Sequence, residues 1–135
     1  MEAPYRALTA QEMQLLERLL DHEFPGRDEL RAQLGSVEGR TIDEDGGLSL
    51  RCSAESRAPV SCRVPTEGRC VDLDGVHINV ALHVVEGFVN ELEIYKDDSS
   101  RVKQRPRAGD LAVIDPRSVP AIDLSRYNRK RAPSS

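Results

Sequence analysis

Aromatic side chains are scarce in this sequence, and tryptophan is absent. Only three tyrosines and two phenylalanines occur among the 135 residues. A chain of this length forms one domain with a modest core, which leucine, valine and isoleucine must therefore supply. No apolar run approaches the length of a membrane-spanning helix, and the first residues lack the apolar stretch of a secretory signal. We therefore expect a cytoplasmic protein that does not enter a membrane.

Cysteine is also scarce, with three residues at irregular spacing. An odd number of cysteines in such a chain favours reduced thiols over a disulfide framework. A zinc site formed by Cys52, Cys62, Cys70 and His77 would lack the C-x2-C pair that structural zinc sites usually contain. Nothing near the thiols indicates the lowered pKa that a cysteine nucleophile needs. The sequence therefore predicts no metal, no cofactor and no catalytic residue of this type.

Catalytic motifs, phosphate-binding loops and internal repeats are not found in the sequence. Two acidic stretches, Asp43–Gly46 and Asp72–Gly75, faintly resemble calcium loops. Both lack the full ladder of oxygen ligands and its closing glutamate. Asp-Gly pairs are well suited to tight turns, so we interpret both stretches as turns.

Charge is divided unevenly along the chain. The last twenty residues, 116–135, contain five basic residues and one acid, whereas residues 1–115 carry a net charge of −8. We therefore predict one folded domain over residues 1–115, followed by a flexible basic tail over residues 116–135.

The clearest structural signal is the stretch Val76–Tyr95, in which apolar and polar residues alternate on both sides of a turn. A three-residue loop, Val85–Gly87, would pair Val84 with Phe88 and place Gly87 in the left-handed conformation that glycine tolerates. One face of this hairpin is then apolar: Val76, Ile78, Val80, Leu82, Val84, Phe88, Leu92 and Ile94. The other face carries His77, Asn79, Ala81, His83, Val89, Glu91, Glu93 and Tyr95. In this register His83 lies opposite Val89, Asn79 opposite Glu93 and His77 opposite Tyr95.

Two helices are predicted before the hairpin. Thr9 and Glu12 form the pattern of a capping box, and an apolar stripe at helical spacing follows as far as Leu20. A second helix is predicted over 27–34, with Gly35 as its terminator. Further strands are predicted at 37–43, 47–53 and 59–64 (continuing near 70–73), with Ile42 paired to Leu48. Residues 111–114 are predicted to form either a final short strand or a packed turn. This order predicts an α+β fold in which two N-terminal helices pack on an antiparallel, meander-like sheet of about five strands.

The polar face of the predicted hairpin is the candidate site. We predict that His77, Asn79, His83, Glu91 and Glu93 bind a partner. Histidine and carboxylate side chains on adjacent strands also suit a metal ion or a proton relay. The plainer interpretation, to which we give more weight, is that an antiparallel sheet has one solvated face.

Two short motifs carry a family resemblance. They are Leu8-Thr9-x-x-Glu12 and the stretch Glu91–Asp98, which follows the turn at Gly87. In these motifs the chain resembles small bacterial α+β proteins of uncharacterised families, some of which look like the immunity partners encoded beside secreted toxins. The resemblance implies an immunity-type or accessory role and transfers no catalytic residue.

The sequence thus favours a non-enzymatic protein-binding module that uses an acidic surface, for which a basic protein is the natural partner. The alternative is a small enzyme or small-molecule-binding protein with a pocket between helices and sheet, in which His77 or His83 acts as acid or base. Nucleic-acid binding through Arg126–Arg131 is disfavoured because the acidic body would repel phosphates. A homodimer through an exposed sheet edge is compatible with the sequence.

Overall fold

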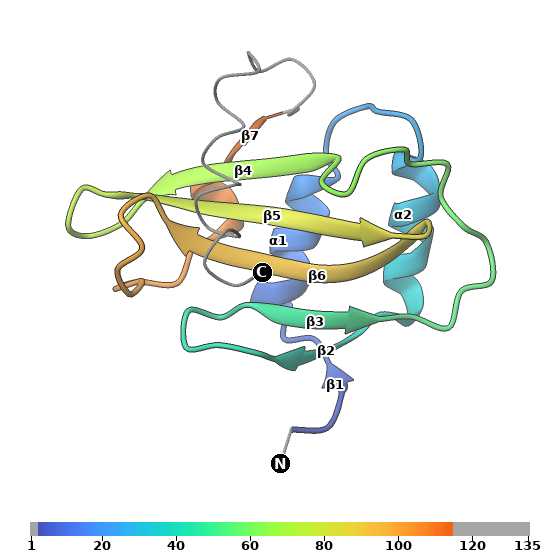
Figure 1. The fold of residues 1–135 in the computed structure, drawn as a ribbon, viewed down its shortest axis with the longest axis horizontal. Helices are drawn as coiled ribbons and strands as arrows, with labels where there is room; N and C mark the ends of the chain where they lie inside the picture. The colour runs from blue at the N-terminus through green and yellow to red at the C-terminus, as the bar shows by residue number, and fades with distance from the viewer. Residues whose placement is uncertain (1–2, 115–135) are drawn as a thin grey trace.

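The computed structural model describes residues 3–114, so the predicted basic tail at 116–135 lies outside the described residues. Two helices, α1 (Ala10–Leu19) and α2 (Arg27–Gln33), pack on one face of an antiparallel sheet (Figure 1). The strands of this sheet are β1 (Arg6–Ala7), β2 (Glu38–Thr41), β3 (Leu48–Arg51), β4 (Thr66–Val71), β5 (His77–Val85), β6 (Phe88–Lys96) and β7 (Ala112–Ile114). Short 3-10 turns, η1 (Leu34–Ser36) and η2 (Ala108–Asp110), complete the described elements.

The predicted α+β class is confirmed, but within residues 3–114 the sheet has seven strands rather than five. Their spatial order is β1-β2-β3-β6-β5-β4-β7. Only β4, β5 and β6 form a meander, because β3 pairs with β6 and β7 returns to pair with β4. The extra edge strand β1 was not predicted from the sequence, and it pairs Arg6 with Gly39.

The strand predicted at 59–64 is wrong. The chain from Cys52 to Pro65 forms no strand, and the next strand, β4, begins at Thr66. Gly68 is needed inside β4 because a Cβ at this position would lie 2.5 Å from the Leu111 side chain. The alternation at 59–64 was misleading, and Cys62 within this segment is exposed.

The central hairpin uses a shorter turn than the alternation predicted. Val85 pairs with Phe88 across the two-residue turn Glu86-Gly87, and both turn residues have positive φ. An irregularity between the His83 and Val84 pairs leaves Asn90 as an extra residue on β6, so that Leu82 still faces Leu92. Without this bulge, a two-residue turn would place Leu82 against Glu91 on the buried face.

The bulge also changes which residues share a face near the turn. Val89 pairs with Val84 and belongs to the hydrophobic core, whereas Phe88 pairs with Val85 and is only half-buried. Their predicted faces were therefore exchanged. Beyond the bulge, Val80 pairs with Ile94 as part of the apolar face, as the alternation of the two strands predicted.

The β2–β3 hairpin is displaced by one residue from the predicted register. Thr41, rather than Ile42, pairs with Leu48, and Ile42 remains exposed. The Asp43 carboxylate accepts hydrogen bonds from the backbone N–H groups of Asp45 and Gly47, which widens the loop. This turn chemistry was not visible in the apolar pattern.

The core lies between the helices and one face of the sheet. The predicted capping box at the start of α1 is confirmed by bonds between Thr9 and Glu12 in both directions. Gly35 is not a left-handed terminator of α2, since it has no positive φ and the chain continues into η1. Leucine, valine and isoleucine make up most of the buried cluster: Leu15, Leu16, Leu19, Leu20, Leu30, Leu48, Ile78, Val80, Leu82, Leu92 and Ile94.

Candidate functional site

The five residues predicted to bind a partner lie on the sheet face that points away from the helices. His77, Asn79 and His83 occupy alternate positions of β5, while Glu91 and Glu93 occupy alternate positions of β6. Their neighbours in sequence point to the helices and form the core. The pairings differ from the prediction: His83 lies opposite Glu91, Asn79 opposite Tyr95, and Glu93 opposite Ala81.

An ordered hydrogen-bond chain links Arg63, His83 and Glu93 on this face. Arg63 Nε donates to His83 Nδ1 at 2.9 Å, and His83 Nε2 lies 2.8 Å from Glu93 Oε1. Since a guanidinium cannot accept, Nδ1 is the acceptor and Nε2 carries the proton that is donated to the carboxylate. The chain joins β5 and β6 to the segment that precedes β4.

A second polar group is centred on Asp97, just after β6. Asp97 Oδ2 accepts from Arg69 Nη2 at 2.6 Å, and Oδ1 accepts from Asn79 Nδ2 at 2.7 Å. His77 Nδ1 lies 4.0 Å from Asp97 Oδ2. This group therefore connects β4 and β5 to the end of β6 through one carboxylate.

Burial separates the five predicted residues into two classes. Asn79 and His83 are fully buried and Glu93 is 7% exposed, so these side chains hold strands together. Only His77, which is exposed, and Glu91, which is half-buried, reach the surface where a partner could contact them. The expected solvated face is thus largely a packed polar layer, and the role of these residues in partner binding stays a prediction.

Sequence reasoning missed a buried ionic group at the opposite end of the hairpin from the turn. Lys96 is 1% exposed, although its strand position pairs it with Ile78. Its ammonium lies 3.0 Å from Asp72 Oδ2 and also contacts the Asp74 carboxylate. The stretch Asp72–Gly75 is a turn, as predicted. Its two aspartates and the lysine at position 96 were the only features of the sequence that pointed to these ion pairs.

Asp72 also fixes the chain that follows β6. Its two carboxylate oxygens accept hydrogen bonds from the backbone N–H groups of Lys103 and Gln104. Burial alone would raise the pKa of the Asp72 carboxyl, but the hydrogen bonds from Lys103 and Lys96 lower that pKa well below its usual range. The Lys96 ammonium likewise lowers the pKa of Asp74. Asp72 therefore stays ionised inside the protein and anchors the backbone at Lys103 and Gln104.

The three cysteines form no disulfide with one another. Cys70 is buried, Cys52 is half-buried and Cys62 is exposed, and all three are free thiols. Burial raises the pKa of the Cys70 thiol, and the nearby carboxylates of Asp110 and Asp72 raise it further. Within residues 3–114, no group of three or more histidine, cysteine, aspartate and glutamate side chains is placed to hold a metal ion.

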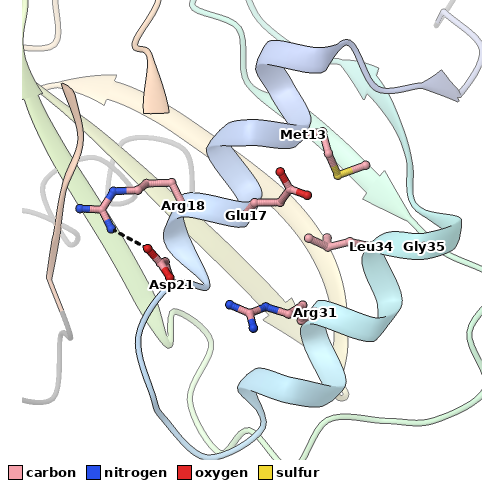
Figure 2. Close-up of a pocket in the computed structure, with 7 residues that line it drawn as sticks. All are labelled: Met13, Glu17, Arg18, Asp21, Arg31, Leu34 and Gly35. Carbon is pink, nitrogen blue, oxygen red and sulfur yellow. Dashed lines mark ion pairs between the residues drawn. The ribbon is translucent and has the colours of Figure 1, made fainter. Parts of the chain in front are cut away.

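An open groove lies between α1 and α2, on the side of the helices away from the sheet (Figure 2). Its volume is about 610 Å³, and we call it the α1–α2 groove. Met13 and Leu34 lie between the two helices, and Glu17 points from α1 toward α2 (Figure 2). The complete lining comprises Met13, Glu17, Arg18, Asp21, Arg31, Leu34 and Gly35.

The helix layer, by which we mean residues 10–33, contains three arginines. All three form ion pairs or hydrogen bonds within the protein. Arg18 Nη1 lies 3.5 Å from Asp21 Oδ2, and Arg27 Nε donates to Asp28 Oδ1 at 2.8 Å. Arg27 and Arg31 also donate to the Leu20 carbonyl, at 3.2 Å and 3.1 Å. These guanidinium groups stand at the C-terminal end of α1, where the helix dipole favours positive charge.

Carboxylates remain at the surface of the same layer. Residues 10–33 contain six acids but only three arginines, so this stretch carries a net charge of −3 with histidine neutral. Glu17 and Glu23 are exposed, and neither forms an ion pair within the described part of the chain. The lining of the α1–α2 groove itself contains two acids and two arginines, so the negative charge belongs to the surface of the two helices as a whole.

A smaller recess lies between α1 and the sheet. Its volume is about 150 Å³, and its lining includes Leu15, Leu92, Ile94, Arg105 and Pro106. Sites for drug-sized ligands typically measure roughly 300–1,000 Å³, so this recess is small for such a molecule. His77 and His83, proposed as acid or base in the enzymatic alternative, lie on the other face of the sheet from this recess.

The described part of the chain thus defines an α+β protein with helices on one face of an antiparallel sheet and a packed polar layer on the other. The chain belongs to the family DUF6984, a domain of unknown function, whose model matches residues 5–106. No curated protein and no solved structure matched the chain. None of the helices in residues 3–114 combines the length and apolar character needed to cross a membrane.

Proposed function

We propose that this protein is a non-enzymatic protein-binding module that presents the acidic surface of its helix layer to a basic protein partner. The observation that carries the proposal is the charge of that layer. Its three arginines are held by Asp21, Asp28 and the Leu20 carbonyl, whereas Glu17 and Glu23 remain exposed and unpaired within the described residues. Such a surface attracts a positively charged partner over a distance and orients its approach.

On the polar face of the sheet, only the side chains that reach the surface contribute to this function. His77 and Glu91 reach the surface there, but Asn79, His83 and Glu93 are buried. Replacing a buried residue would disturb packing as well as binding, so effects at those three positions could not be assigned to a partner. The biological role that we propose for this module is an immunity-type or accessory one.

The test is an affinity pull-down of the full-length tagged protein from its native lysate, with nuclease added and mass spectrometry as the readout. We expect one basic protein at near-equal stoichiometry, and its association should weaken as ionic strength rises, because salt screens exposed charges. Recovery of an acidic partner, or binding that is insensitive to salt, would contradict the proposed surface.

A further inference from the structure

We propose that the α1–α2 groove is the seat for one amphipathic, basic helix of the partner. This inference rests on the proposed function and specifies which part of the acidic surface makes contact and what it contacts. The groove supplies Met13 and Leu34 between its walls, and the Glu17 carboxylate beside them (Figure 2). Apolar residues of the incoming helix cover the first two side chains, and a lysine or arginine pairs with the third.

The shape of the groove favours a helix over an extended segment. Its walls are two helices that lie side by side, and a third helix can pack its ridge of side chains into the space between them. An extended segment would need a free strand edge for backbone hydrogen bonds, and the edge strands of the described sheet are β1 and β7. Neither of these strands lines the groove.

Charge favours a basic partner over a second copy of this chain. Two helix layers placed face to face would bring together surfaces of net charge −3 each. A basic helix can instead pair with Glu17, which forms no ion pair within the described residues. Arg18, which would repel that helix, is already paired with Asp21. A small anion is a poorer occupant because the lining that presents the Arg31 guanidinium also presents the Glu17 carboxylate, which repels an anion.

Gly35 provides a way to block the groove without disturbing the fold. It lines the groove, is exposed and has no positive φ. A Cβ built at Gly35 meets no atom within 4 Å. A bulky residue there therefore enters open space and occupies part of the seat. Gly109 offers a matched control, since a Cβ at that position also meets nothing within 4 Å and it lies in η2, outside the groove.

The experiment uses labelled full-length protein and two synthetic amphipathic helices, one of leucine and lysine and one of leucine and glutamate. NMR titration with the leucine–lysine peptide should shift the signals of Met13, Glu17 and Leu34, and the leucine–glutamate peptide should bind at least tenfold more weakly. Gly35→Phe should lower the affinity for the leucine–lysine peptide at least tenfold at an unchanged melting temperature. Gly109→Phe should leave that affinity unchanged.

Two outcomes would overturn the groove as the seat. One is equal affinity of Gly35→Phe and wild type, and the other is a set of shifted signals that excludes residues 13–21 and 31–35. The natural partner, once recovered, separates this inference from the proposed function. If Gly35→Phe binds that partner with normal affinity while charge reversal at Glu17 and Glu23 weakens binding, this result supports the acidic surface as the binding site and contradicts the groove as the seat of the helix. If charge reversal has no effect, the proposed function itself fails.

Discussion

Lys96 shows how far a single residue can depart from the pattern of its strand. It follows Ile94 on the core-facing side of β6, yet it is a lysine whose ammonium contacts two aspartates, Asp72 and Asp74. Burial of an unpaired ammonium would be strongly unfavourable, and removing one partner of a buried ion pair leaves such a charge behind. The ionic group is therefore a single unit that joins the β4–β5 turn, the end of β6 and the backbone at Lys103 and Gln104.

Replacing Asp72 by asparagine should destabilise the protein in a pH-dependent way. The folded-state pKa of Asp72 is depressed, so its contribution is fully present above the unfolded-state pKa, about 3.9. That contribution is lost as the pH falls through the folded-state pKa. Urea unfolding of both proteins should therefore show a large stability difference at pH 7 that shrinks below about pH 4. A difference that stays constant down to pH 2 would contradict the assignment.

Gln33 is a second buried polar residue on which the packing depends. Its Nε2 donates to the Gly87 carbonyl at 2.8 Å, and its Oε1 accepts from the Val89 N–H at 3.0 Å. Gln33→Leu leaves both backbone groups without this partner, and we expect a loss of about 2–4 kcal/mol in the free energy of unfolding. The exposed Gln14→Leu on α1 is the control, with a change within about 0.5 kcal/mol. Equal stabilities of the two variants would refute this role.

Among the elements, the β5–β6 hairpin shows what alternation could and could not predict. The alternation assigned Ile78, Val80 and Leu82 correctly to the core face and placed the five candidate residues on the other. It could not reveal the bulge at Asn90, because an inserted residue restores the pattern after the turn. The burial of Asn79 and His83 was equally hidden, since it depends on contacts far apart in sequence.

The turn of this hairpin supports a prediction at the same scale. Glu86 has a φ of 53°, a left-handed conformation that costs most residues about 1–2 kcal/mol. Asparagine before glycine is favoured in such two-residue turns, so Glu86→Asn should stabilise the protein by about 0.5–1 kcal/mol. Thermal and urea unfolding can measure this change.

Gly87→Ala is the opposing variant at the neighbouring turn position. Gly87 has a φ of 86°, and an added Cβ would lie 2.8 Å from Arg57 Cβ and 2.9 Å from the Ala58 carbonyl oxygen. We expect a clear loss of stability from strain and collision together. A wild-type melting temperature for Gly87→Ala would show that the turn differs from the one described.

At the scale of the whole molecule, the sequence indicated the fold class and the acidic charge of the domain. It did not indicate which of the distant strands pair in the sheet. The helices before the strands indicated α+β, and the acidic character of residues 1–115 is present in composition alone. The pairing of β3 with β6 and of β7 with β4 joins distant segments, and local patterns do not determine such pairings. The α1–α2 groove was likewise not anticipated, because it depends on how two helices lie relative to each other.

The most direct test of the account is the affinity of the recovered partner for the double variant Glu17→Lys, Glu23→Lys. Both residues are exposed, and lysine in the last turn of α1 suits the helix dipole, so the variant should fold normally. The double variant Glu55→Lys, Glu86→Lys, at two exposed acids outside the two helices, changes the net charge by the same amount and is the control. We expect the double variant to bind at least about tenfold more weakly at low salt, with the difference narrowing as salt is added. Equal affinity of the double variant and wild type would contradict the claim that the helix layer is the binding surface.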